Sequence, residues 1–310
     1  MKRLAKYLLM RFGWTARQIR DRQDSFVMMF HGVGDRDMPR EKFIALLEEL
    51  NRLFRIRPMD ELPDAISLSK SSPDSKPSLF LTFDDGLKNN HSIAYPILLS
   101  KSIPATFFLC PGLIGSGQWI WTHEMRSRLR SLSPDSLVSL ATDVFGTTLS
   151  VEEIIRRLKT STLSSRLEIQ EEIRSRTARF CPTEAMHDAF DLMSWKDAKS
   201  LDPSIVTIGS HTMTHQMLDS ATEEEIESEV GRSRTALEEN LGRTVRHFCY
   251  PDGRHRPEAV EAVRRHYQSA VTTKSGTITG CSDPHLLSRV GSDPDLPEGL
   301  WRLARSPGRP

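Results

Sequence analysis

Two adjacent acids, Asp84 and Asp85, follow the apolar run SLFLTF (78–83) and precede Gly86. An Asp-Gly pair after a strand is typical of a turn, and an acid at this place often caps a following helix. Two neighbouring carboxylates also repel each other unless a nearby cation offsets their charge. The pair alone therefore favours a turn, and it indicates catalysis only if other residues supply a cation.

A second pattern that could do chemistry is SHTMTH (210–215), which places His211 and His215 four residues apart. If a helical turn starts there, both imidazoles lie on one face, a spacing that suits a single metal ion. An isolated pair of this kind is more often a surface or core feature. Two histidines plus one carboxylate, with an open position for water, are typical of a catalytic metal site. One acid of the pair would then bind the metal, and the other would accept a proton from the attacking water.

These residues require strands that bring them together, and the sequence predicts seven. The apolar runs lie at 25–30, 78–83, 105–110, 204–210, 246–251, 268–273 and 286–290. Helical patterns at 40–54, 222–242 and 256–267 alternate with them, which indicates a mostly parallel sheet with helices outside it. A closed barrel and an open doubly wound sheet both fit this alternation.

Polar residues stand where several of the predicted strands end. His31, Asp84, His211 and Tyr250 each follow or close a run. In parallel α/β folds the side chains at the carboxyl ends of strands gather on one face. We therefore expect residues nearly two hundred positions apart in the sequence to converge at one site.

The remaining segments divide the chain. Residues 1–24 predict a basic N-terminal helix, 25–291 the main domain, and 292–310 a C-terminal tail ending in a disordered RSPGRP. Within the main domain, 123–192 is polar and helical in pattern and predicts an insertion after the third strand. The stretch 69–77 predicts a flexible loop. The basic helix either covers one end of the domain, which we favour, or rests on an anionic membrane as a weak peripheral contact.

Composition excludes several classes of protein. The 310 residues are 38% hydrophobic and 27% charged, with a formal net charge of +1, which is typical of a globular chain and gives no electrostatic case for a nucleic-acid partner. The four scattered cysteines, without a CxxC pair, argue against a disulfide framework and for a reducing compartment.

The N-terminus lacks the apolar core of a signal peptide. We expect a cytoplasmic protein, with the inner face of the membrane as its alternative location.

Three motifs in order carry a family resemblance. TFDDG (82–86), SHTMTH (210–215) and FCYPDG (248–253) resemble the motifs of the polysaccharide deacetylase family, the NodB-homology carbohydrate esterases. The resemblance covers about residues 26–291 and is strongest to members with a histidine on an N-terminal strand. It implies a distorted (β/α) barrel of about seven mostly parallel strands with a helical insertion.

The resemblance also implies residue roles. Asp84 matches the general base, and Asp85, His211 and His215 match the ligands of Zn²⁺ or another divalent metal such as Co²⁺. Tyr250 matches the residue that lines the groove and offers a backbone N–H to the oxyanion. The implied reaction is hydrolysis of N-acetyl groups on amino sugars, or of O-acetyl groups in some members.

The chain departs from the family pattern at the general acid. Many members carry a late Leu-x-His motif, whereas Ser288 holds that position here and His285 precedes the strand. His31, at the end of the first strand, is the best replacement, because the first and last strands of a closed barrel are neighbours. The alternative interpretation is that His31 belongs to a turn with Gly32 and takes no part in catalysis.

A second departure concerns an arginine of the third motif. In the usual family pattern this arginine stands two residues before the tyrosine and orients the catalytic acid, whereas Phe248 holds that position here. Arg289 either supplies the missing charge near the substrate or forms a surface salt bridge. Trp121 and His123 line the substrate groove in one interpretation, while in the other Trp121 anchors the insertion.

The resulting prediction is a metal-dependent hydrolase of an N-acetyl group on an amino-sugar glycan, whether polysaccharide, lipid-linked or nucleotide-linked, with a role in surface-polysaccharide biosynthesis. One alternative keeps the metal but changes the substrate to a non-sugar amide or a formyl group. Another is a sugar-binding pseudoenzyme without activity, although all three metal ligands and the base are present.

Overall fold

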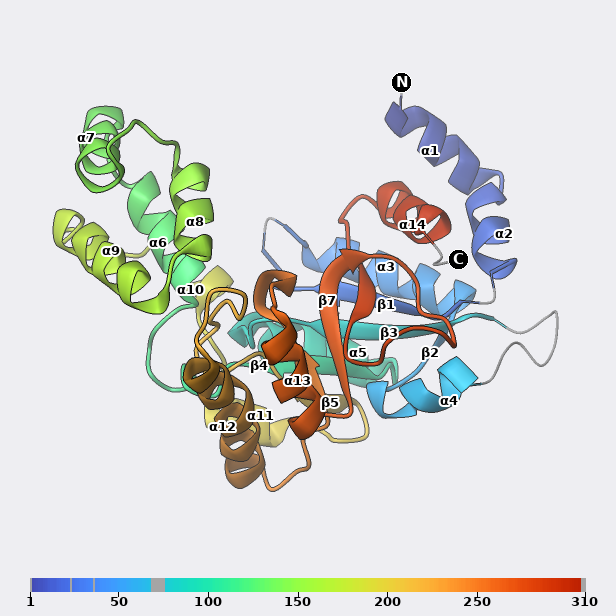
Figure 1. Cartoon of the computed structure of the whole chain (residues 1–310). Helices are drawn as coiled ribbons and strands as arrows, with labels where there is room; N and C mark the ends of the chain where they lie inside the picture. The colour runs from blue at the N-terminus through green and yellow to red at the C-terminus, as the bar shows by residue number, and fades with distance from the viewer. Residues whose placement is uncertain (1, 23, 36, 68–75, 308–310) are drawn as a thin grey trace.

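The computed structural model describes residues 2–22, 24–35, 37–67 and 76–307. Its centre is a closed barrel of seven parallel strands, as predicted, and an eighth short strand, β2, pairs with β3 (Figure 1). The ring closes because β1 pairs with both β3 and β8. The strands are β1 (Phe26–Phe30), β2 (Arg55–Ile56), β3 (Ser78–Phe83), β4 (Ala105–Leu109), β5 (Val206–Ser210), β6 (His247–Cys249), β7 (Ser269–Ser275) and β8 (Leu287–Gly291).

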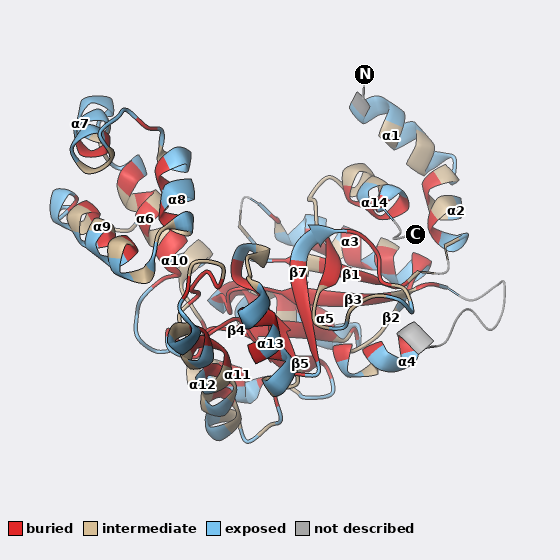
Figure 2. Ribbon diagram, viewed as in Figure 1, coloured by how far each residue is buried: buried red, intermediate tan, exposed pale blue. Residues whose placement is uncertain are grey.

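The strands are apolar on both faces because each face packs against a different layer. Alternate residues such as Val27, Phe80 and Val271 form a cluster to which six strands of the ring contribute, so this cluster fills the barrel. The intervening residues, among them Phe30 and Phe83, join the larger core under the outer helices. Figure 2 shows the strands as a buried centre surrounded by helices with exposed outer faces.

Several outer helices match the sequence prediction closely. Helix α12 (Glu223–Leu241) begins at a capping box between Thr222 and Glu225 and ends at Gly242, which takes the left-handed conformation (φ 64°) that favours glycine. The other helices and helical turns of the barrel are α3 (Arg40–Leu53), η1 (Met59–Glu61), α4 (Leu62–Ser67), the π-helical η2 (Asn90–Ala94), α5 (Tyr95–Ser100), α11 (Trp195–Ser200), η3 (Pro251–Gly253) and α13 (Pro257–His266).

The insertion is a helical lobe that stands beside the barrel (Figure 1). It consists of α6 (Trp121–Arg130), α7 (Pro134–Phe145), α8 (Val151–Thr160), α9 (Leu163–Arg176) and α10 (Glu184–Phe190). The lobe has its own core, which includes Met125, Leu140, Ile154 and Ile173. The salt bridge of Lys159 Nζ with Asp252 Oδ1 (2.7 Å) connects it to the barrel near the third motif.

The two chain ends pack on each other. The N-terminal segment forms two helices, α1 (Lys2–Arg11) and α2 (Trp14–Arg20), separated at Gly13. A helix that the sequence did not predict, α14 (Leu296–Arg305), lies within the expected tail, and Trp301 stacks on Trp14 at 5.7 Å. Of the predicted loop and the predicted disordered end, residues 69–75 and 308–310 lie outside the described residues. No helix in the described part is long and apolar enough to cross a membrane.

Candidate active site

The carboxyl ends of the strands form a pocket of 250 Å³. Its lining residues are Met29, His31, Asp84, Asp85, Thr122, His123, Arg126, Lys159, His211, His215, Asp252 and Thr273. Six of the predicted site residues thus meet here, from segments as far apart in the sequence as His31 and His215. Trp121, Tyr250 and Arg289 do not line this pocket.

Asp85, His211 and His215 form the candidate metal centre. Asp85 Oδ1 lies 3.5 Å from His211 Nε2 and 3.3 Å from His215 Nε2, and all three side chains are buried. Among the described residues, Asp85 Oδ1 has no hydrogen-bond partner. A buried carboxylate oxygen without a partner, facing two imidazole nitrogens, fits a divalent cation, and two histidines with one carboxylate are a donor set that zinc accepts.

Neighbouring groups keep the Asp85 carboxylate in its ionised form. Burial alone would raise the pKa of Asp85, but the hydrogen bond with His123 and the nearby imidazoles of His211 and His215 lower it well below its usual range, so the carboxylate stays ionised. His211 Nδ1–H donates to the carbonyl oxygen of Cys249 (2.7 Å). This bond leaves Nε2 free and turns it toward Asp85, as an outer partner of a metal-binding histidine does.

The backbone at this centre is strained. Asp85 (φ 72°), Thr212 (φ 64°) and His215 (φ 60°) all adopt left-handed conformations, which residues other than glycine rarely take. His211 and His215 therefore lie on an irregular turn and not on a helix, although their rings still meet at 4.8 Å. Such strain persists where surrounding structure enforces it, and it gathers at functional sites.

Asp84 is held by Arg289 through a bidentate ion pair. Both carboxylate oxygens lie 2.7 Å from guanidinium nitrogens, and both side chains are buried. Arg289 Nε donates to the carbonyl of Thr272 (2.8 Å), which fixes the guanidinium. Burial opposes ionisation of Asp84, but the charge and the hydrogen bonds of Arg289, together with the nearby His211 and His31, outweigh it and lower the pKa of the carboxyl. Arg289 thus contacts the predicted base and is not part of a surface salt bridge.

The comparisons with known proteins identify the family of this chain. The family model described as Polysaccharide deacetylase matches residues 71–271. The chain belongs to the polysaccharide deacetylase family. The Bacillus subtilis (strain 168) protein YxkH, whose name places it in the same family, is 20% identical over 276 residues, which cover 87% of this chain and 72% of the relative.

Solved structures of deacetylases share the fold. The Streptococcus pyogenes deacetylase PplD, solved in complex with acetate, aligns with a TM-score of 0.60 at 18% identity and covers 91% of this chain and 98% of its own. IcaB from Ammonifex degensii aligns with a TM-score of 0.60 at 19% identity and covers 92% and 98%. The resemblance inferred from the three motifs is confirmed.

Tyr250 lies outside the pocket lining, and its backbone N–H has a partner in the barrel. Its backbone N–H donates to the carbonyl of Val271 (3.2 Å), so this donor is already engaged and we do not assign it to the oxyanion. The side chain is buried beside Phe248 and His255, and burial raises the pKa of its hydroxyl. Strand β6 ends at Cys249, and Tyr250 continues the pairing with β7 instead of turning into the pocket.

The two residues singled out in the WIWTHEM stretch have different surroundings. Trp121 belongs to the core of the insertion, and its Nε1–H donates to the carbonyl of His215 (3.0 Å). These contacts favour the second interpretation of Trp121, as the residue that anchors the insertion. His123 lines the pocket and its Nε2 lies 3.2 Å from Asp85 Oδ2, while its ring stacks on Phe190 at 4.6 Å. The sequence indicated no contact of His123 with a metal ligand, because the turn that brings the insertion back over the pocket leaves no local signal.

Of the histidines considered for the general acid, only His31 lies at the pocket. It is exposed and lines the pocket with Asp84, directly after β1, the strand that pairs with β8 through Met28 and Val290, as the barrel argument expected. His285 lies at the opposite end of the barrel, where its Nε2 contacts the carbonyl oxygen of Tyr267 (2.9 Å).

Proposed function

We propose that this protein hydrolyses an N-acetyl group on an amino-sugar glycan and that a divalent metal, zinc or one similar to it, is required. The observation that carries the proposal is the partnerless Asp85 oxygen between His211 and His215, one residue from a second carboxylate that is held ionised. Membership of the polysaccharide deacetylase family supports a hydrolase that acts on acetylated sugars.

The proposed chemistry assigns one task to each residue. A metal held by Asp85, His211 and His215 would supply Lewis-acid activation of the acetyl oxygen and the attacking water. Asp84 accepts the proton of that water, and Arg289 holds its two oxygens in a fixed orientation. His31 then protonates the departing nitrogen, which leaves readily only as a neutral amine.

His123 is a positioning residue in this scheme. Its contact with Asp85 Oδ2 (3.2 Å) leaves Oδ1 as the oxygen that faces the two metal-binding histidines. Because His123 lies on α6, the insertion would influence the metal site directly. Arg126 and Lys159 reach the same pocket from the insertion, where each is paired with a carboxylate.

The proposed substrate is an acetylated intermediate of surface-polysaccharide biosynthesis, carried on a lipid, a nucleotide or a growing chain. A cytoplasmic location, at or near the inner face of the membrane, is supported by the four cysteines, all of which are free. The exposed apolar residues Leu4, Tyr7, Leu8 and Phe12 on and after α1, beside exposed basic residues, support a weak peripheral contact with lipid.

The test combines acetate release with metal analysis. We expect acetate from one or more N-acetyl amino-sugar acceptors of these three kinds, loss of release with a chelator, and recovery when Zn²⁺ or Co²⁺ is added. Asp85→Ala, His211→Ala and His215→Ala should each lose bound metal and activity together. Full metal occupancy in all three variants would contradict the site, and release of formate in place of acetate would identify a deformylase.

A further inference from the structure

A second and larger pocket, of 660 Å³, lies between the insertion and the barrel. Among the described residues, none lines both this pocket and the 250 Å³ pocket of the metal ligands. The two share a wall: Trp121 and Thr214 face the large pocket, while their neighbours His123 and His215 face the metal ligands. Its size is that of a small-ligand site, and nothing in the proposed deacetylation uses it.

One face of α9 supplies the unusual groups of this pocket. Arg166 and Gln170 are four residues apart, so their side chains project from the same face of the helix. Arg166 is only 4% exposed and Gln170 only 3%. Yet neither Arg166 Nε nor Gln170 Nε2 has a hydrogen-bond partner among the described residues. Two buried donors left without acceptors are costly, and a ligand that supplies acceptors would remove this cost.

The nearby carboxylates do not satisfy Arg166. Those whose charges act on it are Glu225 and Glu229, and both are engaged elsewhere. Glu229 accepts from the backbone N–H and the hydroxyl of Thr214 (2.8 and 2.7 Å), and Glu225 caps α12. Burial lowers the pKa of Arg166, which is the expected effect on a cation that lacks a close counter-ion.

The remaining walls suit a sugar ring. The guanidinium of Arg166 lies 4.8 Å from the centre of the Trp121 ring, an arrangement that leaves its edge available for a carboxylate or phosphate. Leu163 and Phe180 also line the pocket, as does Leu167, which is 50% exposed although it is apolar. The two carboxylates of the lining are already bound, Glu124 to Arg128 and Arg174 and Glu229 to Thr214. The unpaired donors and the apolar surface that remain match an acidic saccharide better than a neutral ligand.

We propose that this pocket binds an anionic saccharide whose carboxylate or phosphate is received by Arg166 and Gln170. The site is separate from the metal centre, and its occupation does not require the deacetylation proposed above. The shared chemistry is that of a sugar with one anionic group, which a uronic acid or a sugar phosphate would provide.

Calorimetric titration of the full chain with D-glucuronate, D-glucose 6-phosphate and D-glucose tests this. We expect one or both acidic probes to bind at millimolar concentration and D-glucose to give no heat. The tighter acidic probe tells which anionic group the pocket accepts. Arg166→Met should weaken binding by about tenfold or more, the equivalent of one hydrogen bond to a charged group. Arg156→Met is the matched control, because this exposed arginine on α8 carries the same charge on the same lobe, and its loss should leave affinity unchanged.

A second variant keeps the test decisive if Arg166→Met does not fold. Gln170→Leu removes the other donor without changing charge or size greatly, and it should also weaken the acidic probes, with the thermal unfolding of the variant as the folding check. Equal binding of D-glucose and D-glucuronate, undiminished affinity in a folded Arg166→Met or Gln170→Leu variant, or no binding of either acid would overturn the proposal. Because binding is measured without turnover, its failure is distinct from a failure of deacetylase activity.

Discussion

Asp84 can act as a base only while it is ionised, and Arg289 is the residue that keeps it so. The pair lies 205 positions apart in the sequence, and both side chains are buried. The two short hydrogen bonds offset part of the lost solvation of both ions, and removal of either partner would leave the other charge buried without compensation. Asp84 was predicted from its motif and Arg289 was one candidate for the missing charge, but their ion pair was not predicted, because only closure of the barrel brings β8 to β3 through β1.

Replacement of Asp84 by Asn tests the role of the general base without changing the metal ligands. Asp84→Asn should retain bound metal, since Asp85, His211 and His215 are unchanged, but lose about 10²–10⁴ in turnover, the usual contribution of general acid–base catalysis. Metal content and acetate release on the same sample measure both. Asp252→Asn is the control, because Asp252 lines the same pocket without contacting Arg289 and should keep most of the rate. A metal-loaded Asp84→Asn protein with normal turnover would show that another group takes the proton.

Removal of Arg289 should destabilise the fold in a pH-dependent way. Arg289→Met leaves the Asp84 carboxylate buried without its partner, which costs about 3–5 kcal/mol of unfolding free energy at pH 7. In the native protein the pKa of Asp84 is lowered, so the pair contributes stability above the unfolded pKa of about 3.9, and this is lost as the pH falls through the lower folded value. In the variant Asp84 can be buried as a neutral acid, so the difference between the two proteins should shrink as the pH approaches 4.

Urea unfolding of metal-free protein at pH 7 and pH 4 measures this difference. The control is Arg302→Met, which removes a pair with Asp293 of the same length (2.7 Å) that is partly exposed. Such a pair contributes about 0–1 kcal/mol, so this variant should unfold almost as the native protein does at both pH values. A loss in Arg289→Met that is equally small, or independent of pH, would contradict the role of the buried pair.

At the scale of elements, the ring was predictable because each of its strands is an apolar run between turn or helix signals. All seven predicted runs overlap the seven strands of the ring. Strand β2 is two residues long, too short to show a periodic pattern. Helix α14 was missed because its apolar face, with Leu300 and Leu303, becomes meaningful only against the N-terminal helices and α3. The arrangement of the insertion over the pocket, and hence the contacts of His123 and Trp121, depends on packing that no local pattern encodes.

Because β1 lies between β8 and β3, His31 at its carboxyl end is placed to act as the general acid, and this role can be tested by kinetics. If His31 protonates the leaving nitrogen, His31→Ala should lose about 10²–10⁴ in rate on an N-acetyl sugar. A nitrophenolate leaves without a proton, so hydrolysis of nitrophenyl acetate should keep much of its rate, with metal content unchanged. His285→Ala is the matched control, since that histidine lies at the other end of the barrel and should affect neither substrate. Equal losses on both substrates would give His31 a structural role.

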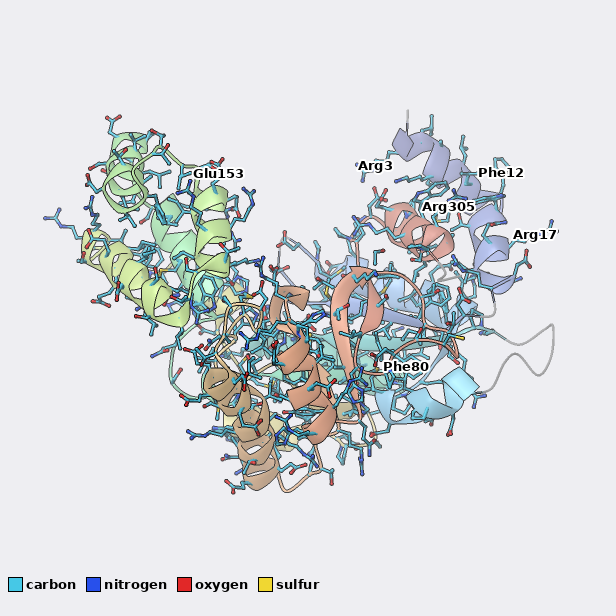
Figure 3. All side chains as sticks on the ribbon, in the orientation of Figure 1. Arg3, Phe12, Arg17, Phe80, Glu153 and Arg305 are labelled. Carbon is cyan, nitrogen blue, oxygen red and sulfur yellow. The ribbon has the colours of Figure 1, made fainter. Side chains whose placement is uncertain are left out.

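At the scale of the whole molecule, the barrel separates two helical groups, the insertion and the chain ends. Figure 3 places Glu153 of the insertion on one side and Arg3, Phe12 and Arg305 of the chain ends on the other. The metal-ligand pocket and the 660 Å³ pocket lie on the insertion side, and the side of the chain ends carries Leu4, Tyr7, Leu8 and Phe12 exposed beside basic residues. This division would let the protein contact a membrane while the pocket stays open to a glycan.

The membrane contact can be tested on the described N-terminal helices. Leu4 and Leu8 lie on one face of α1, and Phe12, which follows the helix, is 81% exposed. Leu8→Ser combined with Phe12→Ser should reduce sedimentation with anionic vesicles by about tenfold or more, because each buried side chain contributes about 1.5–3 kcal/mol. Neutral vesicles and high salt should weaken binding of the native protein, since basic residues contribute. Leu99→Ser combined with Val138→Ser is the matched control, exposed apolar residues on other elements, and should bind as the native chain does. Equal binding of both double variants would place the contact elsewhere.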